Sequence, residues 1–432
     1  MSAVVAPEDI VLIEDHSRPI ETFVLSLPVG CLHDPPGKEG LAYLTGQMLL
    51  RGAGSRDHAA FVDEIDFLGS SLSVGTSRER TSVSGDALTR NLDAIEGLVA
   101  DLLGAPHFDP AELDKLRRQT IAELAQVQDN DSALGHRFFA RALFGEHPYG
   151  RPLKGTEESL ARIGIDDVRA FFAERFVTQG AIVGVAGDIG RERLDAFLAA
   201  TLGRLPQRAA EVPTVPACAV QEGYRLVLVD KPERSQTQVF IGHVTLDANH
   251  EDFFPLLVAQ TIFGGTFTAR ISHEIREKRG WSYGAYSYLS ADRHLGTFTI
   301  RFYPATGDTV PAIVLADQMF SELVRDGISE SEVDFAKSYL SNSHCFAIDT
   351  PERLLSERLS AKLNGRPDDF VESFVARVNA VTREAANAAV RRHLRPDAQV
   401  AAVVATAAEL KPALEAWERV TSLETVDYKS QP

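Results

Sequence analysis

The chain of 432 residues has few of the features that mark a secreted or a membrane-spanning protein. Its three cysteines, Cys31, Cys218 and Cys345, are odd in number and far apart, which indicates a reducing compartment and no disulfide framework. No apolar run approaches the ~20 residues that a membrane-spanning helix needs. The first residues contain neither a basic group nor an apolar core, so they do not predict a signal peptide. We therefore expect a cytoplasmic protein without a membrane partner, or a periplasmic one if a leader was removed.

Positive charge is also scarce, because 61 acidic residues outnumber 44 basic ones and leave a formal charge of −17. Nucleic-acid phosphates need a basic face on the protein, so no nucleic-acid partner is expected. The charge permits attraction to basic peptides, although most acidic proteins are acidic for solubility alone. The composition is 44% hydrophobic and 24% charged, which is typical of a globular protein, and the length allows two to four packed units.

The recognisable catalytic motifs are missing as well. A zinc site commonly uses two histidines one helical turn apart, yet no two of the twelve histidines are separated by three or four positions. Neither HExxH nor HxxEH occurs, and there is no Gly-x-Ser-x-Gly elbow or glycine-rich phosphate loop. The chain therefore has no recognisable catalytic centre of its own, and no cofactor is expected in it.

A duplicated pattern of strands and helices is present. The second half repeats the first at an offset of about 216 to 220 positions. Helices are expected to begin near Pro110 and near Ser329, each with an acidic opening typical of a helix N-terminus. The other matched segments are the strands at 9–14 and 22–27 with those at 225–229 and 238–243, the helices at 164–172 and 380–388, and the strands at 181–186 and 399–405.

The duplication predicts two homologous α+β domains. Residues 206–222 have a linker composition, since they include Pro206, Pro213 and Pro216 together with alanine and glutamine. We therefore expect an N-terminal domain over 1–205 and a C-terminal domain over 223–432.

One segment resembles the signature helix of the pitrilysin/insulinase family of zinc peptidases. The segment is Gly-Leu-Ala-Tyr-Leu-Thr-Gly-Gln-Met at 40–48, and the family pattern is Gly-Leu-Ala-His-x-x-Glu-His-Met. In that family the two histidines bind zinc, and the glutamate is the general base. Here Tyr43 and Gln47 stand at the histidine positions and Gly46 at the glutamate position. Tyrosine and glutamine are poor zinc ligands, and glycine provides no base.

The resemblance also implies a third ligand position, which falls on Glu123 in a later helix. A solvated or salt-bridged helix glutamate is the simpler interpretation of this residue, and a vestigial ligand is the alternative. One ligand of three should not hold zinc at useful affinity. Restoring the motif by Tyr43→His, Gly46→Glu and Gln47→His is expected to recover metal binding, with Glu123 as the third ligand.

Further matches in the same order extend the resemblance over nearly the whole chain. They include His-Pro-Tyr-Gly at 147–150, Gly-Asp at 187–188 and Lys-Pro-Glu-Arg-Ser-Gln-Thr-Gln at 231–238. The resemblance implies the pitrilysin-like fold, in which each domain is a mostly antiparallel sheet packed with several helices. It also implies a clam-shell arrangement of the two domains.

The second half keeps a different motif of the same family. Arg276 and Tyr283, seven positions apart, stand in a segment that resembles the family's Leu-Arg-Glu-x-x-Gly-Leu-x-Tyr pattern. In active members this pair faces the zinc and holds the substrate backbone. Judged alone, the two residues are better explained by a cation that suits a helix C-terminus and a tyrosine packed at a strand start. A turn at Gly280, with Gly264 and Gly265 ahead of the helix, is expected to bring the pair together.

The resemblance implies a subunit that has lost its zinc site and kept the substrate-binding pair. Bacterial and organellar members often work as pairs, so we expect a heterodimer with a homologous HxxEH-bearing subunit that carries the zinc. Unfolded peptides are the expected substrates, and this chain alone is expected to be inactive. The alternative is a structural scaffold, like the core subunits of the cytochrome bc1 complex, or a peptide-binding subunit in cofactor maturation.

Overall fold

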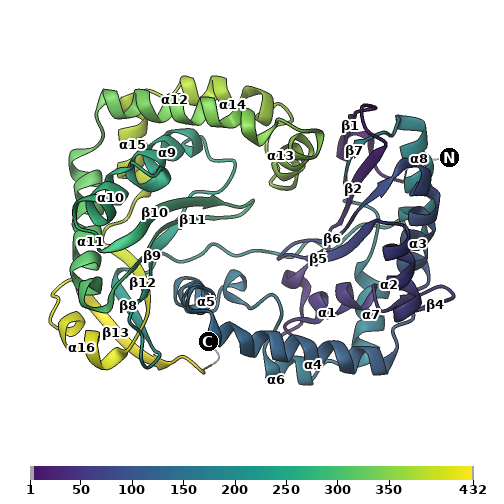
Figure 1. Cartoon of the computed structure of the whole chain (residues 1–432), viewed down its shortest axis with the longest axis horizontal. Helices are drawn as coiled ribbons and strands as arrows, with labels where there is room; N and C mark the ends of the chain where they lie inside the picture. Colours follow the sequence, from purple (N-terminus) through teal and green to yellow (C-terminus); the bar gives the residue numbers. More distant parts are fainter. Residues whose placement is uncertain (1–3, 431–432) are drawn as a thin grey trace. The chain divides into compact units, whose positions relative to one another are not determined.

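The computed structural model describes residues 4–430, and its chain forms two compact units (Figure 1). Unit 1 comprises Met1–Leu124, Arg151–Thr214 and Phe346–Leu363. Unit 2 comprises Ala125–Gly150, Val215–Cys345 and Asn364–Pro432. These units follow the two halves of the sequence except for two segments, 125–150 and 346–363, each of which packs with the other half.

Unit 1 is built on a five-stranded sheet in the order β1-β7-β2-β6-β5. Only the β1–β7 pair is parallel, and the other three pairs are antiparallel. All residues of β7 are buried, as its apolar sequence predicts for an interior strand. The strands are β1 (Ile10–Glu14), β2 (Ile20–Leu27), β5 (Ser71–Thr76), β6 (Thr81–Leu88) and β7 (Ile182–Gly187), and β3 (Gly52–Ala53) pairs with β4 (Arg56–Asp57) in a separate small ribbon.

Unit 2 is built on a six-stranded sheet in the order β10-β11-β9-β12-β8-β13. Five of these strands, β8-β12-β9-β11-β10, repeat the order and the directions of β1-β7-β2-β6-β5, and β13 is added in parallel beside β8. The prediction of a duplicated, mostly antiparallel α+β fold is therefore confirmed. The strands are β8 (Gly223–Asp230), β9 (Gln238–Thr245), β10 (Ser282–Ala291), β11 (Gly296–Pro304), β12 (Ala398–Ala405) and β13 (Val420–Asp427).

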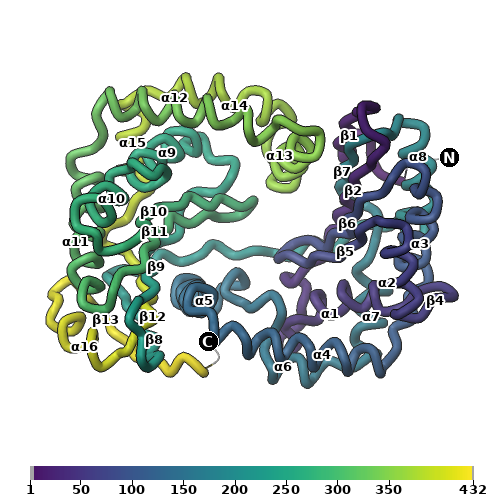
Figure 2. Tube along the Cα trace, viewed as in Figure 1, coloured from purple at the N-terminus to yellow at the C-terminus, as the bar shows by residue number. Residues whose placement is uncertain are grey.

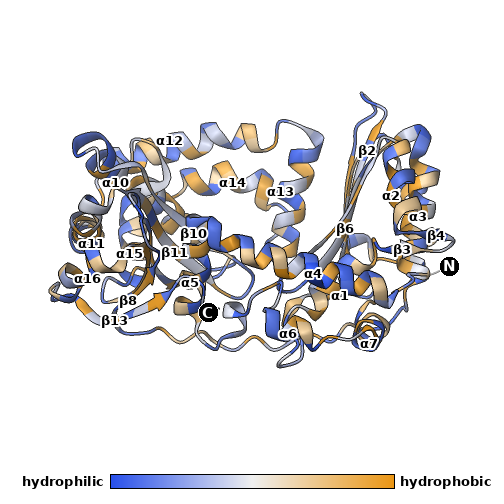
Figure 3. Cartoon of the chain, turned by 60° about the horizontal axis from the view of Figure 1, so that its bottom comes forward, coloured by the Kyte–Doolittle hydropathy of each residue, from blue (hydrophilic) through white to orange (hydrophobic). Residues whose placement is uncertain are grey.

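Helices cover both sheets, and apolar residues concentrate on the strands and on the helix sides that face them (Figure 3). Among residues 4–430, no helix is long and apolar enough to cross a membrane. The helices of unit 1 are α1 (Leu41–Met48), α2 (His58–Phe67), α3 (Leu92–Gly104), α4 (Pro110–Gln126), α6 (Glu157–Ala161), α7 (Ile165–Arg175), α8 (Arg191–Ala200) and α13 (Pro351–Leu363). Those of unit 2 are α5 (Asp131–Phe144), α9 (Phe253–Gln260), α10 (Arg270–Ser272), α11 (Thr309–Asp326), α12 (Glu330–Ala347), α14 (Phe370–Asn379), α15 (Arg383–His393) and α16 (Ala407–Glu415).

The two exchanged segments each supply a helix that packs on a sheet. Helix α13, distant in sequence, lies beside β7 and β1 (Figure 2). It approaches so closely that a Cβ atom on Gly184 of β7 would lie 3.0 Å from Leu355. Helix α5 packs on β12 and β9 in the same way, and a Cβ atom on Gly135 would lie 2.6 Å from the Phe240 ring. The starts of α5 and α13 are about 220 positions apart, so this exchange is itself part of the duplication.

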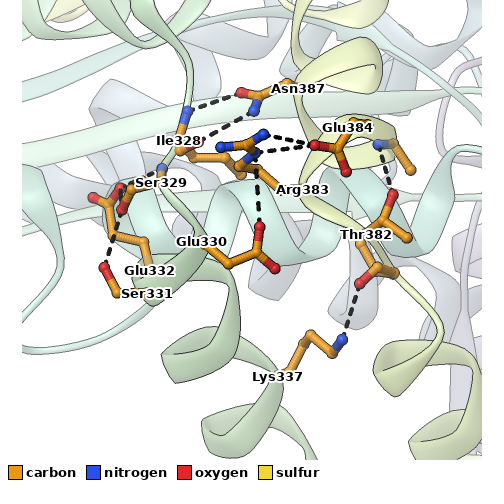
Figure 4. A network of polar contacts seen from close by, with 12 residues as sticks. Ile328, Ser329, Glu330, Ser331, Glu332, Lys337, Thr382, Arg383, Glu384 and Asn387 are labelled. Atoms are coloured by element: carbon orange, nitrogen blue, oxygen red, sulfur yellow. Dashed lines mark hydrogen bonds and ion pairs between the residues drawn. The ribbon is translucent and has the colours of Figure 1, made fainter.

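Helix starts follow the capping signals of the sequence. Helix α4 begins at Pro110 and α12 at Glu330, as predicted. At α12 the Ser329 backbone N–H donates to the Glu332 carboxylate, at 2.9 Å. Figure 4 shows this contact within a wider polar network, in which Asn387 of α15 pairs with the backbone of Ile328 through 2.8 and 3.2 Å hydrogen bonds. This network ties the start of α12 to α15.

A buried carboxyl group stands out in the core of unit 1. Glu21 of β2 is 1% exposed, and neither of its carboxylate oxygens has a hydrogen-bond partner among the described residues. Phe23 and Phe197 line the small cavity beside it. Burial raises the pKa of Glu21 to about 7, although the charge of Arg193 pulls it in the opposite direction.

We predict that Glu21→Gln stabilises the protein in alkaline buffer. Because the folded-state pKa lies above the ordinary 4.5, the stability present at low pH is lost as the pH rises through about 7. Glutamine carries no charge at any pH, so the variant should gain about 1 to 3 kcal/mol of unfolding free energy above a pH of about 7, and this gain should disappear as the pH falls toward the ordinary 4.5. Urea unfolding in buffers on either side of the pKa measures the difference.

The matched control is Glu14→Gln on strand β1 of the same sheet, because that side chain is exposed. This variant should leave the pH dependence of unfolding as it is in the wild type. Parallel curves for the Glu21→Gln variant and the wild type would contradict the assignment of the pH dependence to this carboxyl group.

Candidate functional site

The candidate site in unit 2 forms where a helix ends and strand β10 begins. The π-helical turn η8 (His273–Lys278) carries Arg276, and Tyr283 follows in β10. Gly280 between them has φ +66°, in the left-handed region that favours glycine. The Gly280 N–H donates to the Arg276 carbonyl at 3.0 Å, and the Trp281 N–H donates to the Ile275 carbonyl at 3.0 Å. The expected sequence of helix, turn and strand is therefore present.

The Arg276 guanidinium lies near two aromatic rings. Its carbon is 3.5 Å from the ring centre of Phe267 and 5.5 Å from that of Tyr283. Cation–π attraction at these distances contributes about 0.5 to 2 kcal/mol and holds the planar guanidinium in one orientation. The structure thus brings Arg276 and Tyr283 together, as the sequence predicts. Tyr283 is 79% exposed, so its ring is not a packed core residue.

One nitrogen of this guanidinium has no partner. The Nη1 atom of Arg276 is shielded from solvent and has no hydrogen-bond acceptor among the described residues. No carboxylate pairs with Arg276 within residues 4–430, although Lys278 and Arg279 of the same helix end both pair with Glu274. An unsatisfied, shielded donor costs about 1 to 3 kcal/mol. Such a donor is suited to an acceptor that arrives with a ligand.

Phe267 is a member of this site that sequence reasoning missed. It lies between the π-helical turn η7 (Thr261–Gly265) and α10, and it is 51% exposed. It precedes Arg276 by nine positions, which is not a helical spacing, so periodicity does not connect the two residues. Its only signal is a large aromatic residue among small and polar ones directly after Gly264 and Gly265.

The position of β10 is fixed by contacts with α9 and η7. The side-chain amide of Gln260, at the end of α9, donates to the Ser287 carbonyl at 2.6 Å. The backbone of Gly264 also lies against this strand, since a Cβ atom on it would collide with the Ser287 nitrogen. A side chain at position 264 is therefore excluded, and the glycine has a structural reason independent of any ligand.

The degenerate zinc motif in unit 1 lies on the short helix α1. The Asp34 carboxylate accepts hydrogen bonds from the backbone N–H groups of Gly40, at 2.8 Å, and Ala42, at 2.7 Å. Burial raises the pKa of Asp34 to about 7, although these two hydrogen bonds act in the opposite direction. A well-capped helix thus survives at this position without its ligands.

Two of the motif residues, Gly46 and Gln47, pack against strand β5. A Cβ atom on Gly46 would lie 2.8 Å from the Thr76 hydroxyl and 3.2 Å from Val74. The side-chain amide of Gln47 donates to the Val74 carbonyl at 2.6 Å. This bond repeats the bond from Gln260 in unit 2, because both join residues separated by 27 positions. Gln47 therefore holds helix α1 against strand β5.

The remaining two positions, Tyr43 and Glu123, both lie beside the ammonium group of Lys154. The Lys154 ammonium lies 2.7 Å from the Glu123 carboxylate and 5.4 Å from the ring centre of Tyr43. Burial lowers the pKa of Lys154, but the hydrogen bond to Glu123 and the Tyr43 hydroxyl outweigh it, and the pKa is raised. Lysine is therefore charged beside both motif positions. These residues do not fit a zinc ion. The Gln47 amide is bonded to Val74, the Glu123 carboxylate is paired with Lys154, and the Lys154 ammonium places a positive charge beside Tyr43 and Glu123.

Another group of histidine and carboxylate side chains lies in unit 2, apart from the predicted positions. Ligand atoms of His250, Asp252 and His393 lie within 4.8 Å of one another. The Asp252 carboxylate is already paired with His393 at 2.7 Å and with Arg392, and the His250 Nδ1 atom accepts from the Asp252 N–H at 3.0 Å. The geometry is that of a satisfied ion-pair cluster, in which Asp252 lies at the start of α9 and His393 at the end of α15.

We predict that Gly46→Ala destabilises the protein and that Gly97→Ala does not. Both glycines are helical, but a Cβ atom at Gly97 of α3 would meet nothing within 4 Å. The added methyl at 46 should cost about 1 to 3 kcal/mol of unfolding free energy through overpacking. The same change at 97 should give a gain of up to about 1 kcal/mol from helix propensity. Equal effects of the two substitutions in urea unfolding would contradict the close packing of α1 on β5.

Because of this packing, we no longer expect the three substitutions in the zinc motif to recover metal binding. The variant Tyr43→His, Gly46→Glu, Gln47→His should hold less than stoichiometric zinc, because a glutamate side chain introduced at position 46 would collide with β5 and Lys154 remains nearby. Elemental analysis after dialysis measures the metal, with the wild type as the control. One tightly held zinc ion per chain in the triple variant would contradict this account.

Two sequence profiles of one peptidase family match the chain. The profile described as "Insulinase (Peptidase family M16)" matches residues 9–157. The profile described as "Peptidase M16 inactive domain" matches residues 162–340. The two matches follow one another in order, with the degenerate motif in the first and the Arg276/Tyr283 pair in the second.

Individual proteins match over most of their length. An uncharacterized zinc protease of Mycobacterium bovis is 28% identical over 361 residues, which cover 82% of this chain and 81% of that protein. The non-peptidase homolog YmxG of Helicobacter pylori is 24% identical over 391 residues, covering 88% of each chain. A crystal structure of a peptidase M16 inactive domain from Pseudomonas fluorescens shares the fold with a TM-score of 0.84 at 24% identity, covering 91% of this chain and 94% of that one. The chain belongs to peptidase family M16, the insulinase family.

Proposed function

We propose that this chain is a non-catalytic, substrate-binding subunit of a heterodimeric zinc metalloendopeptidase. The partner would be a homologous M16 subunit that carries the HxxEH motif and the zinc ion. Arg276 and Tyr283 would complete the active site of that partner. The chain alone would then hydrolyse no peptide, because its sequence lacks the HxxEH motif that holds zinc and activates water.

The single observation that carries this proposal is the state of Arg276. Its guanidinium is held against Phe267 and near Tyr283, with a shielded Nη1 donor that no described residue accepts. The neighbouring cations of the same helix end, Lys278 and Arg279, are both paired with Glu274. A purely structural subunit gains nothing from a shielded, unpaired donor beside an exposed tyrosine. A subunit that binds peptide carbonyls uses both groups.

The chemistry of the pair suits a peptide bond under attack. The guanidinium is a permanent cation with a rigid fork of donors, which can hold a peptide carbonyl in one orientation. The Tyr283 hydroxyl is a neutral donor on an exposed ring. Aimed at a carbonyl oxygen as it gains negative charge, one such donor contributes ~2 to 4 kcal/mol to lowering the barrier. The zinc of the partner would supply the activated water.

A second candidate function is a scaffold or peptide-binding subunit without any role in proteolysis. The name of the Helicobacter pylori relative, a non-peptidase homolog, favours this alternative. The two candidates differ in the need for a catalytic partner. Copurification of the chain with an HxxEH-bearing M16 subunit favours the peptidase, and peptide binding without such a subunit favours the alternative.

We predict that Tyr283→Phe lowers peptide hydrolysis by the reconstituted pair ~10- to 1000-fold, because it removes one donor from the developing oxyanion. The substitution removes only a hydroxyl from an exposed side chain, so assembly of the two subunits should be retained. Hydrolysis of a quenched fluorescent peptide gives the rate, and size-exclusion chromatography gives the assembly.

The matched control is Tyr339→Phe, which removes a hydroxyl from a 44% exposed tyrosine on α12. Its rate should equal that of the wild type. A wild-type rate in the Tyr283→Phe pair would show that the Tyr283 hydroxyl takes no part in hydrolysis. Chelator-sensitive hydrolysis by the purified chain alone would refute the proposal as a whole.

A further inference from the structure

One face of the β10–β11 hairpin collects tyrosines. Tyr286 and Tyr288 of β10 and Arg301 and Tyr303 of β11 share this face, and the irregular register between Ser282 and Ala285 places Tyr283 opposite Tyr303 on the same side. In β11, residues 298, 300 and 302 are buried, whereas the alternate residues 299, 301 and 303 are partly exposed. Arg301 stands directly opposite Tyr286 in the antiparallel register. These four tyrosines and Arg301 are termed the tyrosine face.

Helix α5 covers the adjoining part of the same sheet and stops short of the tyrosine face. It packs on β12 and β9, where Phe139 stacks on Phe240 with ring centres 6.0 Å apart. Arg301 lies at this boundary, because its guanidinium is 5.0 Å from the Phe240 ring and donates to the Ser132 hydroxyl of α5 at 2.5 Å. Beyond the boundary, Tyr288 is half exposed and Tyr283 is largely exposed.

Two of the four tyrosine side chains, those of Tyr286 and Tyr303, are held in place by their neighbours. A Cβ atom on Gly284 would lie 2.5 Å from the Tyr286 ring and 2.6 Å from the Tyr303 hydroxyl, so both side chains pack over this glycine. Tyrosine has few rotatable bonds and combines an apolar ring with a polar tip, which gives contact area at low entropic cost. A preorganised surface of this kind loses little freedom when a ligand binds.

The charge of this surface is opposite to that of the chain. The whole sequence carries −17, yet Arg276 and Arg301 beside these tyrosines pair with no carboxylate in the described part of the chain. Each also has one shielded guanidinium nitrogen without an acceptor, Nη1 in Arg276 and Nε in Arg301. A carboxylate is the acceptor that arginine binds most strongly. The surface is therefore complementary to an anionic side chain.

The edge of strand β10 is less suited to a ligand than its face. At the middle of the strand, the Ser287 carbonyl already accepts from Gln260, and Gly264 lies against the Ser287 nitrogen. A peptide that added itself as a further strand would have to displace both contacts. A ligand that lies across the tyrosine rings displaces neither.

We propose that the tyrosine face binds an extended peptide that carries a carboxylate side chain, with Arg301 as the residue that pairs with this carboxylate. This inference rests on the proposed function, because the peptide bound here is the one that Arg276 and Tyr283 would present to the partner. It adds a preference to that function. Acidic extended peptides bind more tightly than neutral ones of the same length, although the chain as a whole is acidic.

Fluorescence anisotropy of the purified chain tests this preference. The probes are two short, fluorescein-labelled, unstructured peptides that are identical except that glutamate in one is glutamine in the other. In Arg301→Gln, binding of the glutamate peptide should weaken about 10-fold, as expected for loss of one charge-assisted hydrogen bond, and binding of the glutamine peptide should stay within about twofold. Arg301→Lys should retain part of the preference, because it keeps the charge and loses the fork of donors.

Controls separate a specific site from general attraction to cations and rings. Arg325→Gln removes an exposed arginine at the end of α11, and Tyr339→Ala removes an exposed tyrosine from α12. Both should bind the two peptides as the wild type does. Tyr288→Ala should weaken both peptides by a similar factor. Circular dichroism of each variant verifies that it is folded before binding is compared.

The outcomes distinguish this inference from the proposed function. Equal affinity of the wild type for the two peptides, or an equal loss for both in Arg301→Gln, would overturn the carboxylate preference while hydrolysis by the reconstituted pair could still occur. Conversely, an Arg301-dependent preference in a chain that supports no hydrolysis with any HxxEH-bearing partner would refute the proposed function and leave the inference standing.

Discussion

The hydrogen bond from Gln260 to the Ser287 carbonyl anchors the outer edge of strand β10, whose other edge pairs with β11, and the candidate site depends on that strand. Tyr283 and the four other members of the tyrosine face lie on β10 or on its partner β11, and Arg276 lies on the turn that leads into β10. The bond is buried, so breaking it would leave two shielded polar groups unsatisfied at a cost of about 1 to 3 kcal/mol each. Together with the close approach of Gly264, it joins a helix, two π-helical turns and a strand into one piece. This explains how a largely exposed tyrosine can keep a fixed position beside an arginine.

The equivalent bond in unit 1 gives a physical reason for the state of the zinc motif. Gln47 donates to Val74 across the same separation as Gln260 to Ser287, so the helix of the degenerate motif is clamped to its edge strand as in the other half. Once the helix is held there, Gly46 has no room for a side chain, and a lysine ammonium lies beside Tyr43 and Glu123. The difference from a zinc-binding helix is therefore one of packing as well as of ligand identity.

Much of the fold could be predicted from the sequence because its signals are local. Strands such as β7 and β12 are continuous apolar runs, and α4 and α12 begin where acidic capping residues stand. The turn at Gly280 also follows from one residue type, which is why Arg276 and Tyr283 could be paired in advance. Contacts between distant segments could not be predicted in this way. The exchange of α5 and α13 between the units, the pairing of Lys154 with Glu123 and the stacking of Phe267 on Arg276 depend on tertiary packing. In the last case, π-helical turns also break the regular spacing from which neighbours are inferred.

The unpaired donors of Arg276 and Arg301 indicate that the second half retains groups suited to binding a ligand. Most other arginines of the described chain pair with acidic residues, of which this sequence has a large excess, so carboxylate partners would be easy to supply. A shielded guanidinium nitrogen without an acceptor is a standing cost in the free protein. Such a cost is recovered only when an acceptor binds, and tyrosines that flank both arginines provide the apolar contact that a peptide backbone and its side chains need. The motif positions of the first half are engaged in internal contacts, whereas these two arginines of the second half keep donors without an acceptor among the described residues.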